Sequence, residues 1–288
     1  MGNVKKRIYL SSPAGKIRVQ NILGIIGLEQ ATSEWETESG YLQDGAVLGA
    51  GRYQERNVTL RWDVESREAV REISRVTGKQ VVRLEIEERS AAGERAVYRL
   101  EPCRVSSALR VTAHGQRWFT CSLQLTAADP YIKKEVVPRV LTGEDAGKVY
   151  ENDRLYYRED VLTVSRNRME LRVFNNGDTD TPMSIRFAGP ADNPWLENAL
   201  TGERIGVNLS IGDGETVTVY TGYGKKRLLL TDGSGVSRNV FSAIAEGSVF
   251  PMLHPGENLL RYGSAGGADA ALTRVQIDYA EQYAGYLL

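Results

Sequence analysis

The chain has 288 residues, of which 41% are hydrophobic and 25% charged, and its 36 basic and 37 acidic residues leave a net charge of -1 at pH 7. This composition excludes a disordered or collagen-like protein, and the near-neutral charge disfavours nucleic acid as the main partner, because nucleic-acid-binding domains usually carry a clear basic excess. No stretch approaches the roughly 20 apolar residues that span a bilayer, and no apolar segment follows Lys5, Lys6 and Arg7, so neither a membrane span nor a secretory signal is expected.

Alternation of apolar and polar residues predicts strands through the first half of the chain. The pattern is clearest in residues 57–62, 82–87 and 119–126. Each segment should bury one face and expose the other, as antiparallel sheets allow. Cys103 and Cys121 lie in strand-like segments and are expected to be small buried apolar groups, because two cysteines make no disulfide framework.

One segment of the first half has helical spacing. Between Ser66 and Thr77 the apolar residues recur every three or four positions, at Ala69, Val70, Ile73 and Val76. Ser66 is a suitable N-cap, and Gly78 stands where a helix often ends with a glycine. The pattern predicts one amphipathic helix that packs on a sheet.

A polar run that follows Pro130 predicts a domain boundary. We expect a first domain at 1–132, a linker at 133–153 and a second domain at 154–288. Beyond the linker, short alternating segments are separated by turn residues at 175–178, 201–203, 212–214 and 232–235. Such a series predicts a β-sandwich or jelly roll. The expected fold class is mainly β, with two β-sandwich domains, the first of which contains one short helix.

The sequence offers little catalytic chemistry. His114 and His254 are its only histidines, and they have neither metal-ligand spacing nor a neighbouring nucleophile. Acidic residues at 85–88 and 178–180 fit the polar face of a strand and a solvated turn. We therefore predict no catalytic, cofactor-binding or metal site and no enzymatic activity.

The segment Asn193–Asn198 is the most suggestive feature for a ligand. An exposed tryptophan beside amides and a carboxylate is how β-sandwich lectins hold sugar rings, so Trp195 and Asn198 are candidate carbohydrate contacts. The alternative, which is favoured, is that Trp195 closes one end of the sandwich core.

Several local motifs occur together in one order along the chain. They are Phe119–Leu123 leading to Ala128–Tyr131, then Thr181–Ile185, then Thr201–Glu203, the glycine-bounded strand containing Val217, and finally Phe250–Asn258 with its Pro-Gly-Glu-Asn ending. In these motifs and in its two-domain β organisation the chain resembles the distal tail protein (Dit) family of bacteriophages with long non-contractile tails. The resemblance covers nearly the whole chain, and it rests on the order and spacing of the motifs.

The resemblance implies a structural role without a cofactor or a membrane. By this resemblance, the first domain of the protein would form a homohexameric ring, and a galectin-like second domain would lie outside the ring. The ring would join the tail tube protein to a tail-tip, baseplate or tail-associated hub protein and let DNA pass. A receptor-binding protein or a cell-wall glycan is a further expected partner. The protein would lie at the distal tail of the virion, after assembly in the bacterial host cytoplasm.

A ring of identical copies needs surfaces that close on one another. The segment Glu29–Arg56 lacks clear periodicity and is expected to be a long loop or arm that reaches the neighbouring subunit through Trp35, Tyr41 and Leu42. A surface loop with a few residues tucked back is an equal alternative. For the whole protein, the alternatives are a carbohydrate-binding β-sandwich module that attaches a phage or an enzyme to cell-wall polysaccharide and, less favoured, a glycoside hydrolase.

Overall fold

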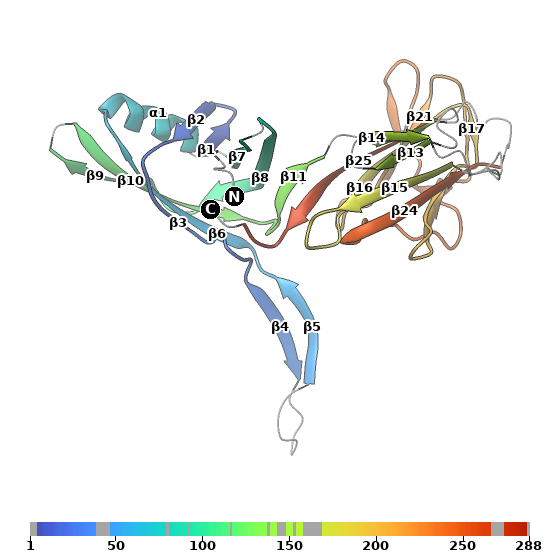
Figure 1. Ribbon diagram of the computed structural model, residues 1–288, viewed down its shortest axis with the longest axis horizontal. Helices are drawn as coiled ribbons and strands as arrows, with labels where there is room; N and C mark the ends of the chain where they lie inside the picture. Colours follow the sequence, from blue (N-terminus) through green and yellow to red (C-terminus); the bar gives the residue numbers. More distant parts are fainter. Residues whose placement is uncertain are drawn as a thin grey trace. The chain divides into compact units, whose positions relative to one another are not determined.

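The chain folds into two compact units, shown in a computed structural model (Figure 1) that describes residues 5–38, 47–78, 81–91, 93–115, 117–136, 139–142, 148–151, 154–157, 169–265 and 274–286. The first unit comprises residues 1–134 together with 282–288, and the second comprises residues 135–281. The predicted fold class, mainly β with one short helix in the first unit, is confirmed for the described residues.

The predicted domain limits differ from these units in two places. Residues 282–288 belong to the first unit, although the sequence assigned them to the second domain. The stretch predicted as a linker, residues 133–153, contains short strands. The domain limits themselves stay a prediction.

The first unit consists of two antiparallel strand groups, called sheets here, that are continuous through β8, together with a separate hairpin and one helix. Its elements are β1 (Lys5–Ser12), β2 (Gly15–Val19), β3 (Ile22–Ile26), β4 (Ser33–Glu38), β5 (Val47–Tyr53), β6 (Arg56–Val64), α1 (Arg67–Thr77), β7 (Val81–Arg89), β8 (Arg95–Val105), β9 (Arg110–His114), β10 (Trp118–Ala127) and β11 (Ile132–Glu135). One sheet has the order β2-β1-β7-β8-β11. In the other, β10 pairs with β6 along one edge and with β9 and the end of β8 along the other, and β3 extends the sheet beyond β6.

A single apolar core fills the first unit. Alternate residues of the strands point into it, as the period-two pattern predicts, and Leu60, Leu84 and Leu123 are at most 1% exposed. Helix α1 adds Ile73 and Val76 to the same core. Both cysteines are buried, and burial raises the pKa of Cys103 to about 12, so its thiol stays protonated and behaves as an apolar group.

The predicted helix begins and ends where the sequence placed it. The Ser66 side chain accepts a hydrogen bond from the Ala69 amide at 3.1 Å, which is the expected N-cap. Gly78 plays a different part from the expected one, because its backbone is extended, with φ at -73°. A Cβ there would lie 2.7 Å from the Ser74 carbonyl oxygen, so a close approach explains this glycine, and a left-handed turn does not.

The second unit is a sandwich of two main antiparallel sheets. Its elements are β12 (Arg139–Thr142), β13 (Lys148–Glu151), β14 (Arg154–Tyr157), β15 (Met169–Asn175), β16 (Met183–Ala188), β17 (Ala191–Asp192), β18 (Trp195–Asn198), β19 (Glu203–Gly206), β20 (Ser210–Ile211), β21 (Thr216–Tyr220), β22 (Arg227–Thr231), β23 (Ser237–Asn239), the short helix η2 (Phe241–Ala243), β24 (Gly256–Gly263) and β25 (Arg274–Tyr283). The sheets have the orders β12-β25-β16-β21-β22-β23 and β15-β24-β18-β19. The rings of Phe187 and Tyr262, one from each sheet, lie 6.0 Å apart in the core between them.

Candidate assembly interface

The sheet that contains β6 and β10 has one free outer edge at β3 and another at β9, while the rest of the β9 side continues through β8 into the β1-β7-β8 sheet. Among the described strands, β3 pairs only with β6, and β9 pairs only with β10. A free edge presents unpaired backbone groups to which another strand can add. Both edges also carry exposed apolar side chains: Ile22, Leu23 and Ile26 on β3, and Val111 and Trp118 beside the other edge. The edge residues Leu23 and Ile26 are 54% and 69% exposed, and with Ile22 they place three exposed apolar side chains on one edge strand.

The two faces of this sheet differ sharply. One face packs into the core, on the same side as α1 and the β1-β7-β8 sheet. The residues that alternate with the core positions are polar, and they are Asn57, Thr59 and Arg61 on β6 with Ser122 and Gln124 on β10. Asn57, Arg61 and Gln124 are exposed to solvent. The sheet therefore presents a polar face between two partly apolar edges.

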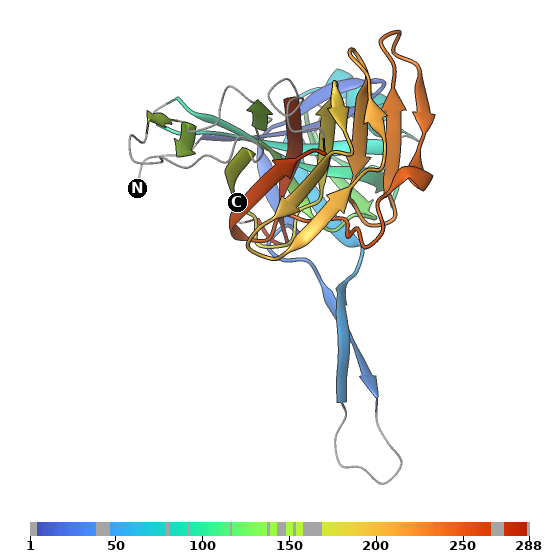
Figure 2. The ribbon, with the colours of Figure 1, turned by 90° about the vertical axis from the view of Figure 1, so that its right-hand side faces the viewer.

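The segment expected to be a loop or arm contains a two-stranded hairpin. Strands β4 and β5 pair with each other and with no other described strand, and both Figure 1 and Figure 2 show the hairpin projecting from the rest of the first unit. We call residues 33–53 the arm. The described strands of the arm form a projecting hairpin, and this favours the predicted arm over the predicted surface loop. Trp35 lies on β4 opposite Gly51, whereas Tyr41 and Leu42 lie outside the described residues. Their contact with a neighbouring subunit stays a prediction.

Arg56 holds the root of the arm. Its side chain is 2% exposed, and the guanidinium donates to the carbonyl oxygens of Pro130 at 2.6 Å, Gly27 at 3.1 Å and Leu28 at 3.0 Å, as well as to that of Ala284. Charge-assisted hydrogen bonds of this kind are among the stronger ones. The sequence pattern did not single out this residue, although Arg56 stands in phase with the buried positions of β6.

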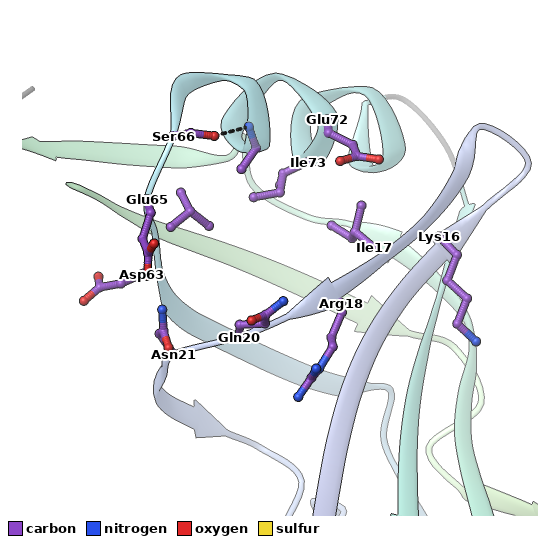
Figure 3. A pocket seen from close by; sticks show the side chains of 12 residues that line it. Lys16, Ile17, Arg18, Gln20, Asn21, Asp63, Glu65, Ser66, Glu72 and Ile73 are labelled. Carbon is purple, nitrogen blue, oxygen red and sulfur yellow. Dashed lines mark hydrogen bonds between the residues drawn. The ribbon is translucent and has the colours of Figure 1, made fainter. Parts of the chain in front are cut away.

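A pocket of about 410 Å³ lies between β2, the end of β6 and α1 (Figure 3). Its charged side chains have both signs: Lys16 and Arg18 come from β2 and Glu72 from α1, and the Lys16 ammonium donates to Glu85 on β7. Asp63 in its wall accepts a hydrogen bond from Thr120 at 2.6 Å, and Ser66 caps the helix. These polar groups serve the fold, and the lining contains no histidine or cysteine that could act as a base or nucleophile.

The two candidate carbohydrate contacts, Trp195 and Asn198, differ in their exposure to solvent. The Trp195 ring is half-buried at the start of β18, with the Arg204 guanidinium 4.0 Å from its centroid. Gly263 lies against the ring, where a Cβ would come within 2.3 Å of Trp195 Cζ2. Asn198 is fully buried and donates to Asn258 Oδ1 at 2.9 Å. The position of Asn198 gives a sugar no access to its amide, and the contact at Trp195 stays a prediction.

The Asn258 amide organises the loop that ends the Phe250–Asn258 motif. Asn258 is fully buried, its Nδ2 donates to the carbonyl oxygens of His254 at 2.8 Å and Gly256 at 3.1 Å, and its Oδ1 accepts from the His254 amide at 3.0 Å. Gly256 has a positive φ of 89°, which favours glycine. The motif is therefore explained by loop geometry.

His254 joins three turns at this end of the second unit. Its Nδ1 lies 2.8 Å from Asp180 Oδ1, and its Nε2 lies 3.0 Å from Glu203 Oε2. Ionised carboxylates only accept hydrogen bonds, so both ring nitrogens donate and the ring is an imidazolium in this arrangement. Partial burial lowers the pKa of His254, but the hydrogen bonds and charges of Glu203 and Asp180 outweigh it and hold the pKa above its ordinary value.

Replacing His254 by glutamine should reveal a pH-dependent contribution to stability. A raised folded-state pKa means that the stabilisation is fully present below the ordinary pKa of about 6.5 and is lost as the pH rises through the folded-state value. We expect the natural protein to exceed the variant by about 0.5–1 kcal/mol near pH 5.5 and by almost nothing near pH 9. Urea unfolding at both pH values measures this difference. His114→Gln is the control, and a difference that widened with rising pH would contradict the assignment.

The described residues contain no group of three or more His, Cys, Asp or Glu side chains arranged to hold a metal ion. Around His254 the two carboxylates lie at opposite ring nitrogens, so they cannot share an ion with it. His114, at the end of β9, places Nε2 3.0 Å from Thr120 Oγ1, and Thr120 donates its hydroxyl proton to Asp63 Oδ1 at 2.6 Å. The hydroxyl therefore accepts from His114, so the imidazole is not placed as a base that would activate Thr120. Among the residues that the structure describes, no helix has the length and apolar character that a membrane span requires.

Comparison with known proteins finds one family match and several solved structures of similar fold. Residues 176–283 match the family described as siphovirus-type tail component, C-terminal domain. The fold is similar to that of the SPP1 Dit protein, described as a paradigm of the hub adsorption apparatus in phages that infect Gram-positive bacteria, over 97% of this chain and 99% of that one, with a TM-score of 0.61 and 12% identity. A chain of the phage p2 baseplate is similar over 99% of this chain and 100% of that one, with a TM-score of 0.48 and 12% identity. No curated protein sequence matches.

Proposed function

We propose, on the premise that this chain is a siphovirus-type tail component of the distal tail protein family, that six copies form a ring joining the tail tube to the tail tip or baseplate. The family consists of structural components, so the chain is a tail hub or baseplate protein and not an enzyme. Its proposed partners are its own copies, the tail tube protein above and a tail-tip or tail-associated hub protein below. A receptor-binding protein or a cell-wall glycan is a further proposed partner.

The two free edges of one sheet carry this proposal. A strand added to an edge satisfies the unpaired backbone groups, and the exposed side chains Leu23 and Ile26 would be buried against the neighbouring copy. Because the edges lie on opposite sides of the same sheet, each copy can offer β3 to one neighbour and β9 to the other. Such a head-to-tail contact generates a closed ring when the rotation between copies permits it.

The layers of the first unit suggest which face lines the ring. Helix α1 and the β1-β7-β8 sheet lie on the core side, so the thicker side fits the longer outer circumference and the polar face of β6 and β10 fits the inside. Four strands from each of six copies, at a spacing of about 4.8 Å, give a circumference of roughly 115 Å and a diameter of about 37 Å before tilt is added. This width admits a DNA duplex. The polar face carries amides and hydroxyls together with the exposed Arg61 and Arg110, so it holds phosphates less strongly than a wall made mainly of cations would.

Deleting residues 40–51 tests the proposed role of the arm. We expect the variant to lose the ring and to run close to the 31.9 kDa of one chain, because the arm is proposed to contact the neighbouring copy. Native mass spectrometry measures the change. Tyr223→Ala, at a side chain that is 94% exposed in the second unit, is the control. A deletion variant that formed rings of correspondingly reduced but still six-chain mass would remove the arm from the account.

Electron microscopy tests the function itself. Purified protein should form six-fold rings, and mixing it with the tail tube protein of the same phage should place one ring at the end of each tube. Rings that never bind the tube would contradict the joining role, and the absence of rings under all conditions would contradict the proposed assembly.

A further inference from the structure

The last described residues return to the first unit and pair with the root of the arm. The Ala31 amide donates to the Ala284 carbonyl oxygen at 2.7 Å, and the Tyr286 amide donates to the Leu28 carbonyl oxygen at 2.8 Å. All four residues are at most 9% exposed. These bonds join the segment just before β4 to a segment that follows the whole of the second unit in the sequence.

The pairing leaves no room for a side chain at Gly285. A Cβ added there would lie 2.2 Å from the Glu29 carbonyl oxygen, which is backbone and cannot turn away. Gly285 has no positive φ, so the close approach alone explains the glycine. Arg56 also joins the two segments, because its guanidinium donates to the carbonyl oxygen of Ala284 as well as to that of Leu28.

Tyr286 anchors the segment to the first sheet. Its hydroxyl donates to Glu88 Oε1 at 2.6 Å, its ring centroid lies 4.9 Å from that of Tyr98, and Lys6 Nζ lies 4.9 Å from the ring. Burial, followed by the Glu88 carboxylate, raises the pKa of the Tyr286 hydroxyl, so it remains a donor at physiological pH. The segment is thus held on the β1-β7-β8 sheet while its backbone holds the arm root.

We infer that residues 284–286 form a strap that positions the arm, so that a copy becomes competent to assemble only after the second unit has been synthesised. The inference rests on the proposed function, because it takes the arm to contact the neighbouring copy. The arm root lies at residues 28–31, and its backbone bonds at Leu28 and Ala31 come from residues made after 135–281. Until then only the bonds of Arg56 to Gly27, Leu28 and Pro130 hold the root, so a growing chain carries an arm that is incompletely fixed, and the strap delays ring formation until the hub protein can present its second unit.

Replacing Gly285 by alanine in the full chain tests the strap. The added methyl should separate the strap from the arm root, so backbone amide exchange at residues 28–31 should quicken by about tenfold or more, while exchange in the second unit stays unchanged. The fraction of chains in rings should fall by a similar factor at equal concentration. Gly233→Ala is the matched control, because its Cβ would meet nothing closer than 3.8 Å and its φ is not positive.

The possible outcomes distinguish a failure of the strap inference from a failure of the proposed ring. Gly285→Ala rings that form as readily as those of the natural protein, with unchanged exchange at residues 28–31, would overturn the strap. If the variant fails to fold, exchange in the natural protein decides: the Ala31 and Tyr286 amides should be protected together, and rapid exchange at either would overturn the inference. A natural protein that stays monomeric with both amides protected would instead contradict the proposed ring and remove the assembly role of the strap.

Discussion

Replacing Arg56 by methionine should lower the free energy of unfolding of the first unit by about 3 kcal/mol or more. The substitution keeps a long side chain but removes the donors for four carbonyl oxygens, those of Pro130, Gly27, Leu28 and Ala284. Because Arg56 is only 2% exposed, water cannot easily take over these bonds. Arg56→Lys should recover little of the loss, since one ammonium group lacks the planar fork of donors.

Urea unfolding followed by tryptophan fluorescence measures the effect of Arg56→Met, because the buried Trp62 reports on the core of the first unit. The matched control is Arg61→Met, on the same strand but exposed, which should change stability by no more than about 0.5 kcal/mol. Equal stabilities for the two variants would show that Arg56 does not hold the arm root.

Placing glutamates on the β3 edge should dissociate the ring into single chains. In a Leu23→Glu, Ile26→Glu double variant, two side chains that are 54% and 69% exposed in one chain become charges that the proposed contact would have to desolvate. Burying unpaired carboxylates costs several kcal/mol, enough to raise the dissociation constant of each contact by at least about a hundredfold. The fold should persist, because neither side chain belongs to the core.

Analytical ultracentrifugation measures this dissociation, with circular dichroism to confirm that the double variant folds. Phe174→Glu is the control, since Phe174 is an equally exposed apolar residue, at 61%, on the second unit. It should leave the ring intact. A double variant that sedimented as the natural protein does would exclude β3 from the contact.

Local patterns of the sequence predicted the elements with a core beneath them. Leu60 and Leu123 stand in period-two segments, and Ser66 and Ile73 stand in the helical one, because burial of one face imposes those spacings. The spacing of apolar residues did not predict the β4-β5 hairpin. Its strands pair only with each other in the described structure, and only the lack of a clear alternating pattern suggested an arm.

Other features depend on contacts between segments far apart in the sequence. From local sequence Arg56 would be taken for an ordinary surface cation, because its hydrogen-bond acceptors on Pro130 and Ala284 are far away in the chain. Asn198 was a candidate sugar contact because local sequence reveals neither its burial nor its hydrogen bond to Asn258. The return of residues 282–288 to the first unit has no local signal either, and chain order placed them in the second domain.

The mass of the purified natural protein in solution tests the central claim most directly. Six copies of the 31.9 kDa chain should give a particle of about 191 kDa by native mass spectrometry or multi-angle light scattering. Its mass should stay constant over a wide range of protein concentration, as a closed ring requires. A 31.9 kDa monomer at every concentration, or a ladder of masses that grows without limit, would contradict a hub built by ring closure.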